Sequence, residues 1–177
     1  MMSRNMTEAP LPKRVDGVKL VDVNQELNGL IDSKQLSRLT AATVTCTEQI
    51  PCHIEFSRDD ERHRILSGNC SAEVVLECQR CLEDVSFAID SDFELALVFN
   101  DEQAKKLPRR LEPAELDEDG RLNLWEIIED EILLNLPDFP MHPEGQCKAH
   151  QTEPQENTAE EEKRPNPFDV LAKLKQK

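Results

Sequence analysis

The stretch VTCTEQIPCHIEF, residues 44–56, decides the fold class. Its apolar side chains fall on even positions and its polar side chains on odd positions, which predicts a strand with one buried face. The buried set is Val44, Cys46, Ile50, Cys52, Ile54 and Phe56. Pro51 cannot donate a backbone hydrogen bond, so we expect an edge strand or a bulged one.

Similar alternation predicts further strands. Residues 64–77 place their apolar side chains on even positions, and Gly68 marks a bulge or bend. Residues 85–99 place theirs on odd positions, as one long strand or as two with a break at residues 90–92. The run GVKLVDV, residues 17–23, predicts a short edge strand. Adjacent antiparallel strands of this kind predict a meander curled into a small, barrel-like sheet.

Two segments have helical patterns. A short helix is expected after Ser33, with Leu36 and Leu39 on its buried face. A longer helix is expected after Asn123, where Glu126 completes a capping-box pattern. Its apolar stripe consists of Leu124, Ile127, Ile128, Ile132 and Leu134. This stripe should pack on the sheet.

We therefore predict an α+β domain over residues 11–143, with a curled antiparallel sheet and one packed helix. Residues 1–10 should be disordered. Residues 144–162 are rich in glutamate and lack apolar periodicity, which predicts a flexible acidic linker. Residues 163–177 carry five basic residues and one acidic residue, which makes them a basic tail.

The basic tail, KRPNPFDVLAKLKQK, has the features of a short docking helix. Asparagine suits its N-cap and proline its first turn, but such a helix is too short to be stable alone. We expect it to dock on a partner or on its own domain, with its basic side chains able to contact phosphates. The residues expected to make the contact are Lys163, Arg164, Asn166, Pro167, Phe168, Leu171 and Leu174. The alternative, a frayed end, stays open.

Composition limits the class of protein. The net charge of −15 favours basic partners over nucleic acid. The sequence has no apolar run of about 18 residues and no apolar signal region near its start, so we expect a cytoplasmic protein that does not enter a membrane. We also expect a monomer. In the cytoplasm its six cysteines should be reduced or bind metal.

The C-x-x-C pair Cys78 and Cys81 has the spacing of half a tetrahedral zinc site. His142 and Cys147 are the candidates for the second half, with His150 in reserve. Four protein ligands would make such a zinc structural. The alternative, which the pattern alone favours, is four metal-free, reduced side chains, with Cys78 continuing the apolar face of its strand. A thiol redox sensor is a further alternative, although the flanking strands differ from the helix N-terminus typical of such motifs.

Catalytic patterns are missing from the sequence. We find neither a supported Ser-His-Asp or Cys-His arrangement nor a glycine-rich phosphate loop. The carboxylates of Glu129, Asp130 and Glu131 are interpreted as the solvated face of a helix. We therefore expect a non-catalytic protein with no small-molecule substrate.

Three segments resemble one family: VVLECQRCLEDV (74–85), IIEDEILLNLPDFPMHPEGQC (127–147) and KRPNPFDVLAKLKQK (163–177). Their order and spacing are similar to the YceD family, the large ribosomal RNA subunit accumulation proteins, over roughly residues 11–177. The L-E-C-Q-R-C block and the N-P-F tail are the specific parts. Many members carry a more cysteine-rich block after the helix, where this sequence keeps only His142 and Cys147.

The resemblance implies a role in the accumulation of large-subunit (23S) ribosomal RNA. We expect an accessory factor in ribosome biogenesis that binds a basic ribosomal protein, rRNA or a large-subunit precursor particle. A protein–protein adaptor unrelated to ribosomes, or a redox sensor that uses Cys78 and Cys81, remains the alternative.

Overall fold

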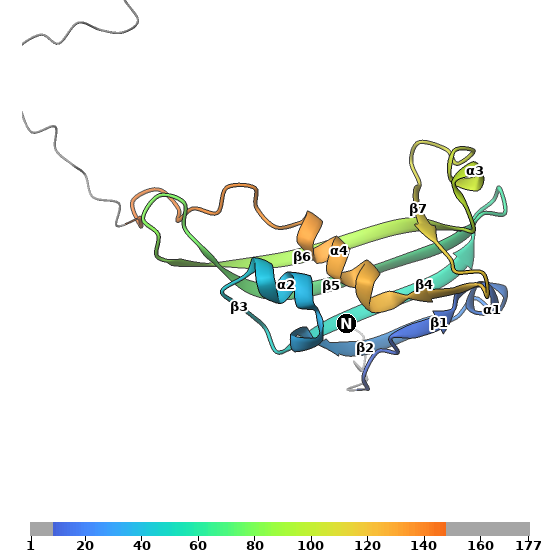
Figure 1. The fold of residues 1–177 in the computed structure, drawn as a ribbon, viewed down its shortest axis with the longest axis horizontal. Coiled ribbons are helices and arrows are strands. Elements are labelled where there is room, and N and C mark those ends of the chain that lie inside the picture. The colour runs from blue at the N-terminus through green and yellow to red at the C-terminus, as the bar shows by residue number, and fades with distance from the viewer. Residues whose placement is uncertain (1–8, 148–177) are drawn as a thin grey trace, which may run out of the picture.

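The computed structural model describes residues 9–147 of the chain. Within these residues the fold is α+β, as predicted, and strands predominate (Figure 1). The elements in order are β1 Arg14–Asp16, α1 Gly17–Asp22, β2 Glu26–Asp32, the 3-10 helix η1 Ser33–Gln35, α2 Ser37–Ala42, β3 Thr45–Cys46, β4 Gln49–Arg58, β5 Arg64–Glu77, β6 Asp84–Val98, α3 Asp101–Ala104, β7 Glu112–Glu115, β8 Arg121–Asn123 and α4 Leu124–Leu134. None of these helices is long and apolar enough to cross a membrane.

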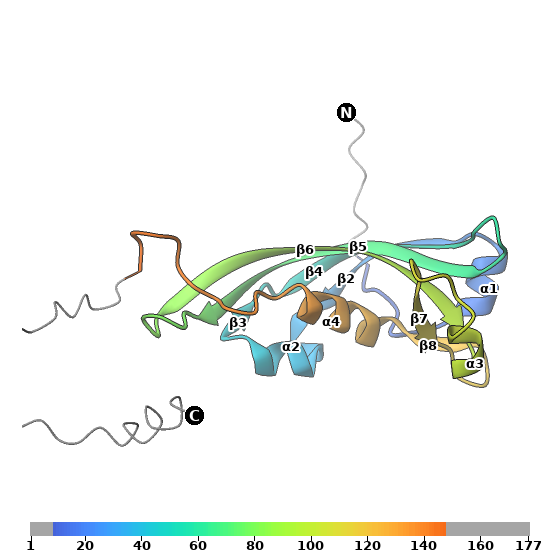
Figure 2. The ribbon, with the colours of Figure 1, turned by 90° about the horizontal axis from the view of Figure 1, so that it is seen from above.

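A curled six-stranded sheet forms the body of the protein. Its strand order is β2-β4-β5-β6-β7, and β3 pairs with β5 off this path. Every pair is antiparallel except β6 with β7, while β1 and β8 form a separate antiparallel pair. Figure 2 shows the sheet as an arch with α2 and α4 on its concave side. The curled antiparallel sheet is confirmed, and it is not closed into a barrel.

The main core lies between the concave face of the sheet and the helices. It takes the even positions of β4 and β5 and the odd positions of β6, as the alternation predicts, but Val44, which was predicted to be buried with them, is 54% exposed and precedes β3. Phe56 on β4 is 1% exposed. On α4, the fully buried Leu124, Ile128 and Ile132 are spaced four residues apart, so one face of the helix meets the sheet. Leu134, predicted in the same stripe, is instead 74% exposed.

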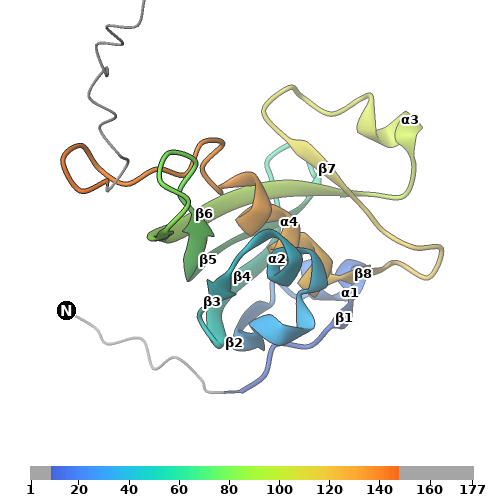
Figure 3. The ribbon, with the colours of Figure 1, turned by 60° about the vertical axis from the view of Figure 1, so that its left-hand side comes forward.

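The helix α2 lies beside α4, and a buried carboxylate joins them (Figure 3). Leu36 and Leu39 are buried as predicted. The prediction that Glu129 is solvated is wrong, because its side chain is 5% exposed and accepts hydrogen bonds from the backbone N–H groups of Arg38 (2.7 Å) and Leu39 (3.1 Å). No side chain of α2's own N-cap residue satisfies these groups, so Glu129 caps α2 from another helix.

The predicted edge strand over residues 17–23 is wrong, since Gly17–Asp22 form α1. The Asp16 side chain accepts a hydrogen bond from the Lys19 backbone N–H at 3.0 Å and caps the helix. Gly17 and Val21, one turn apart, are buried. A Cβ on Gly17 would lie 2.5 Å from the tip of the Leu122 side chain, so a larger residue here would displace the leucines packed against the helix.

Two expectations for the central strands are also wrong. β4 is not an edge strand, because β2 and β5 pair on its two sides; pairing with β5 begins only at Cys52, after Pro51. Gly68 is not a bulge, because the register of β5 against both neighbours runs through it without a break. Its role is close packing: a Cβ there would lie 2.5 Å from the His53 carbonyl oxygen and 2.8 Å from the Phe93 ring.

β6 is one long strand, which resolves the alternative left open at residues 90–92. Ser91 is buried in mid-strand and accepts a hydrogen bond from the Asn135 side chain at 3.0 Å, so the end of α4 satisfies it. At the start of α4, Asn123 occupies the N-cap position but its side chain makes no capping bond, and its Oδ1 is buried without a partner. The predicted capping box is therefore wrong: Asn123 is held in β8 opposite Arg14.

Candidate functional site

The four predicted zinc ligands come together at the far end of the β5–β6 hairpin. Cys78 directly follows β5, and Cys81 lies in the turn that leads to β6. Leu82 closes this turn in the left-handed conformation (φ +61°), with its N–H donating to the Cys78 carbonyl at 2.8 Å. The segment after α4 returns alongside the turn (Figure 1), and the Gln79 N–H donates to the Pro140 carbonyl at 2.9 Å. This contact brings His142 and Cys147 to the C-x-x-C pair.

The distances within this Cys/His cluster match a tetrahedron. The sulfur atoms of Cys78 and Cys147 are 3.9 Å apart, and Cys81 Sγ lies 3.4 Å from His142 Nδ1. All four donor atoms lie within 4.8 Å of one another. Ligands about 2.3 Å (sulfur) and about 2.1 Å (nitrogen) from one zinc ion would be about 3.6–3.8 Å apart at tetrahedral angles.

The surroundings of the cluster orient its ligands. His142 Nε2 lies 3.1 Å from the Asp84 carbonyl oxygen, which as an acceptor leaves Nδ1 free of a proton and available to a metal. Burial raises the pKa of Cys78, but backbone N–H groups of Cys81, Arg80 and His142 directed at its sulfur outweigh this and lower the pKa to about 5. The backbone N–H of Glu83 lowers the pKa of Cys81, whereas burial and the Cys147 and Cys78 thiols raise it, and the net shift is upward.

The remaining cysteines lie away from this cluster. Cys52 and Cys70 are buried on the concave face, as predicted for core thiols, and Cys46 is half-buried against them. Burial raises the pKa of Cys52 strongly, and it raises the pKa of Cys70 to about 12. These two thiols stay protonated at neutral pH and act as apolar side chains.

The convex side of the sheet is a second candidate site. Outward-pointing side chains come from the odd positions of β4 and β5 and the even positions of β6, and we call this surface the open face. None of these positions holds lysine or arginine, and seven hold carboxylates: Glu55, Glu73, Glu77, Asp84, Asp90, Asp92 and Glu94. Figure 2 shows that α2 and α4 leave this side of the sheet uncovered.

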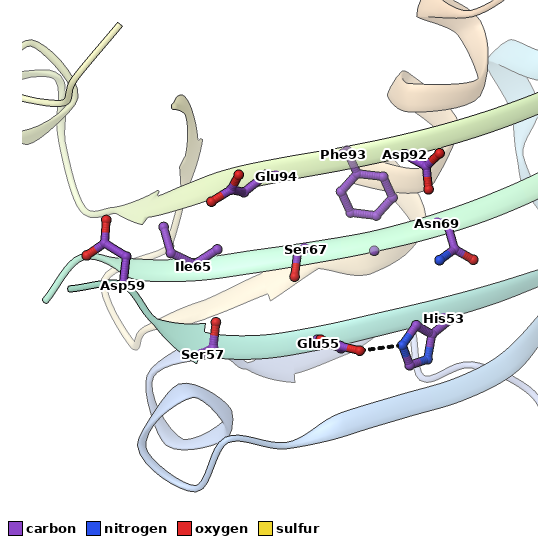
Figure 4. A pocket seen from close by; sticks show the side chains of 11 residues that line it. His53, Glu55, Ser57, Asp59, Ile65, Ser67, Asn69, Asp92, Phe93 and Glu94 are labelled. Carbon is purple, nitrogen blue, oxygen red and sulfur yellow. Dashed lines mark hydrogen bonds and ion pairs between the residues drawn. The ribbon is translucent and has the colours of Figure 1, made fainter. Parts of the chain in front are cut away.

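A shallow groove of about 680 Å³ crosses the open face (Figure 4). At one end, His53 bridges Asn28 and Glu55, with its ring nitrogens 2.7 Å from an oxygen of each. Farther along, Asp92 and Glu94 line the groove, with Glu94 opposite Ser67, and the ring of the core residue Phe93 packs against Gly68.

An arginine reaches one end of this groove. Arg110 pairs with Asp59 at 2.9 Å and with Glu94 at 3.4 Å. Within residues 9–147, no ion pair reaches Glu73, Asp90 or Asp92. The acidic surface therefore stays largely uncompensated along β5 and β6.

The sequence indicated the candidate metal ligands, but it did not indicate the open face. The sequence identified Cys78, Cys81, His142 and Cys147 as candidate metal ligands, and the fold places them together. The reserve ligand His150 lies outside the described residues. The predicted contact residues of the tail also lie outside them: Lys163, Arg164, Asn166, Pro167, Phe168, Leu171 and Leu174. The open face was missed, although the signal was present in the polar positions that alternate with the core positions.

Comparison with known proteins gives a consistent result. A family model described as large ribosomal RNA subunit accumulation protein YceD matches residues 66–175, which span the Cys/His cluster, β6 and α4. The chain is 35% identical over 174 residues to a Haemophilus influenzae protein named "Large ribosomal RNA subunit accumulation protein YceD", covering 97% of this chain and 100% of that protein. No solved structure matches the chain.

Proposed function

The chain belongs to the YceD family of large ribosomal RNA subunit accumulation proteins, and from this premise we propose that it supports the accumulation of 23S ribosomal RNA as a non-catalytic assembly factor. Its direct contact is a basic ribosomal protein, bound alone or on a large-subunit precursor. The observation that carries this proposal is the open face, whose strand positions hold seven carboxylates and neither lysine nor arginine.

The chemistry of the open face fits a basic protein segment rather than RNA. Ribosomal proteins that contact rRNA use lysine and arginine to neutralise its phosphates. A carboxylate surface attracts them and repels the phosphate backbone. The groove along His53, Glu55 and Asp92 is shallow and open, as expected for a protein segment rather than an enclosed small molecule.

The basic tail, residues 163–177, supplies a second contact in this proposal. Its charge is opposite to that of the body, so the two ends of the chain attract different partners. We infer that the tail contacts the precursor particle or its rRNA, with Phe168 and Leu171 docking as one apolar edge. A bridging protein of this kind needs no catalytic group.

The alternative functions have less support. An adaptor unrelated to ribosomes finds no support in the family membership, and a redox sensor would need an accessible dithiol poised for exchange. Cys78 is fully buried, and its C-x-x-C turn lies between antiparallel strands.

Sucrose-gradient sedimentation of cell lysate tests the proposal. We compare the full-length chain with a chain ending at Glu162 and with an open-face variant carrying Glu73→Gln, Asp90→Asn and Asp92→Asn. The matched control removes the same charges from exposed positions elsewhere: Asp101→Asn, Glu118→Gln and Asp119→Asn. All four proteins are probed at low and moderate salt.

The full-length protein and the control should co-migrate with large-subunit precursors at low salt, and moderate salt should weaken that association. The open-face variant and the shortened chain should shift toward the top of the gradient. If all four remain at the top at low salt, stable particle binding is wrong. If the open-face variant sediments like the control, the open face is not the contact.

A further inference from the structure

We propose that Cys78, Cys81, His142 and Cys147 bind one structural zinc ion, which fastens residues 137–147 to the turn between β5 and β6. This inference concerns how the chain is held together and does not depend on the proposed ribosomal role. The four side chains come from two segments that are about sixty residues apart in sequence and lie in contact in the fold.

The donor set selects the metal. Three thiolates and one imidazole are soft or borderline ligands, which suit zinc and disfavour magnesium and calcium. The contacts of 3.9 Å between Cys78 and Cys147 sulfurs and 3.4 Å between Cys81 Sγ and His142 Nδ1 match edges of a tetrahedron around one ion. With all four positions taken by protein, no site remains for water or substrate, so the role is structural.

The backbone around the thiols holds the donor atoms in place. The C-x-x-C turn, closed by Leu82 at φ +61°, brings both of its thiols within 4.8 Å of the His142 nitrogen and the Cys147 sulfur. The Asp84 carbonyl accepts from the other ring nitrogen of His142, an arrangement that fixes metal-binding histidines in one tautomer. An apolar cluster of reduced thiols would need neither feature.

Packing alone does not hold this end of the molecule. Three large apolar side chains of the two segments face solvent: Leu82 is 69% exposed, Phe139 70% and Met141 42%. The backbone hydrogen bond from Gln79 to Pro140 is worth only about 1 kcal/mol, and the Gln79 and Arg80 side chains add only long contacts, to the Asp138 carbonyl oxygen (3.5 Å) and the Met141 sulfur (3.8 Å). A zinc ion supplies the missing connection.

The test is native mass spectrometry of the full-length protein purified under reducing conditions with zinc present. Wild type should carry one zinc per chain, whereas Cys147→Ser and His142→Ala should each lose it. The matched control Cys46→Ser also removes one half-buried thiol, but away from the cluster, and should keep one zinc. His150→Ala should likewise keep it, which separates the reserve ligand from His142.

Cobalt substitution of the wild-type protein tests the coordination geometry and the presence of thiolate ligands, even if a variant fails to fold. Wild-type protein reconstituted with Co²⁺ should show the absorption bands of a tetrahedral site and a thiolate-to-cobalt charge-transfer band. Wild-type protein that carries no zinc and gives no such spectrum would overturn the proposal, as would an intramolecular disulfide in its place. Retention of one tightly bound zinc by Cys147→Ser or His142→Ala would overturn the ligand set.

Discussion

The concave side of the sheet and the Cys/His end of the β5–β6 hairpin are held together in different ways. On the concave side, α2 and α4 cover fully buried residues such as Phe56 and Ile128. At the Cys/His end, Leu82 and Phe139 are exposed, and the two segments meet through polar contacts and through four side chains that could bind a metal ion. The first region should be stable without any ion, whereas the second should need one.

This difference predicts a body that is stable by itself and an end whose stability depends on a bound metal ion. Burial of apolar surface stabilises the body in proportion to the area removed from water. Metal ligation can stabilise a short segment that buries little surface, but only while the ion is bound.

Phe56→Ala should have the largest effect on stability. The side chain is 1% exposed, so its loss leaves a cavity and should lower the free energy of unfolding by about 3–5 kcal/mol. Leu82→Ala, at the Cys/His end, should change it by less than about 0.5 kcal/mol. Urea unfolding monitored by the Trp125 fluorescence measures both, and similar losses would contradict the comparison.

Glu129→Gln should lower the free energy of unfolding by about 1–3 kcal/mol, because a buried charge that accepts from two backbone N–H groups and pairs with Arg38 is lost. Asp130→Asn is the control: Asp130 also pairs with Arg38, but its side chain is 53% exposed, so the loss should be below about 1 kcal/mol. The same urea titration measures the loss of stability in both variants. Equal losses would mean that the cap on α2 contributes nothing beyond a surface ion pair.

Cysteine alkylation should separate the two regions chemically. In zinc-loaded protein near pH 8, Cys52 and Cys70 should react slowly, since burial raises their pKa values and leaves little thiolate. A chelator should speed the labelling of Cys78, Cys81 and Cys147 and leave the two core thiols unchanged. Peptide mass spectrometry measures the rate of labelling at each cysteine. Faster labelling of the core thiols after chelation would show that the metal supports the whole fold.

Acid should weaken a smaller contact at the opposite end of the sheet. Burial raises the pKa of Asp59, but hydrogen bonds from His63 and Arg110 outweigh this and hold it below its usual value of 3.8. A depressed folded-state pKa stabilises the fold above the unfolded pKa, and this stabilisation is lost as the pH falls through the folded pKa. The melting-temperature difference between wild type and Asp59→Asn should therefore shrink below about pH 4. A constant difference would exclude this linkage.

The sequence predicted the features that depend on local periodicity. The alternation in residues 64–77 and 85–99 identified β5 and β6, and the helical spacing of Leu124, Ile128 and Ile132 identified α4. The segment 17–23 misled because Val18 and Leu20 mimic a strand, whereas the cap from Asp16 and the close packing at Gly17 make it a helix.

Features that depend on distant partners were harder to predict. Glu129 is buried because it contacts α2, which lies about ninety residues earlier in the sequence, and no local pattern indicates this contact. The pair Cys78 and Cys81 was visible through its spacing, but its meeting with His142 requires the chain to return after α4. The open face became evident only once the register had placed its carboxylates on one side.

The most direct test of the central claim is the ratio of 23S to 16S ribosomal RNA in cells depleted of this protein and supplied with one variant at a time. The wild-type chain and the Asp101→Asn, Glu118→Gln, Asp119→Asn control should restore the ratio. The Glu73→Gln, Asp90→Asn, Asp92→Asn variant, expressed at the same level, should leave 23S RNA depleted. Full restoration by the open-face variant would contradict the claim that this surface carries the function.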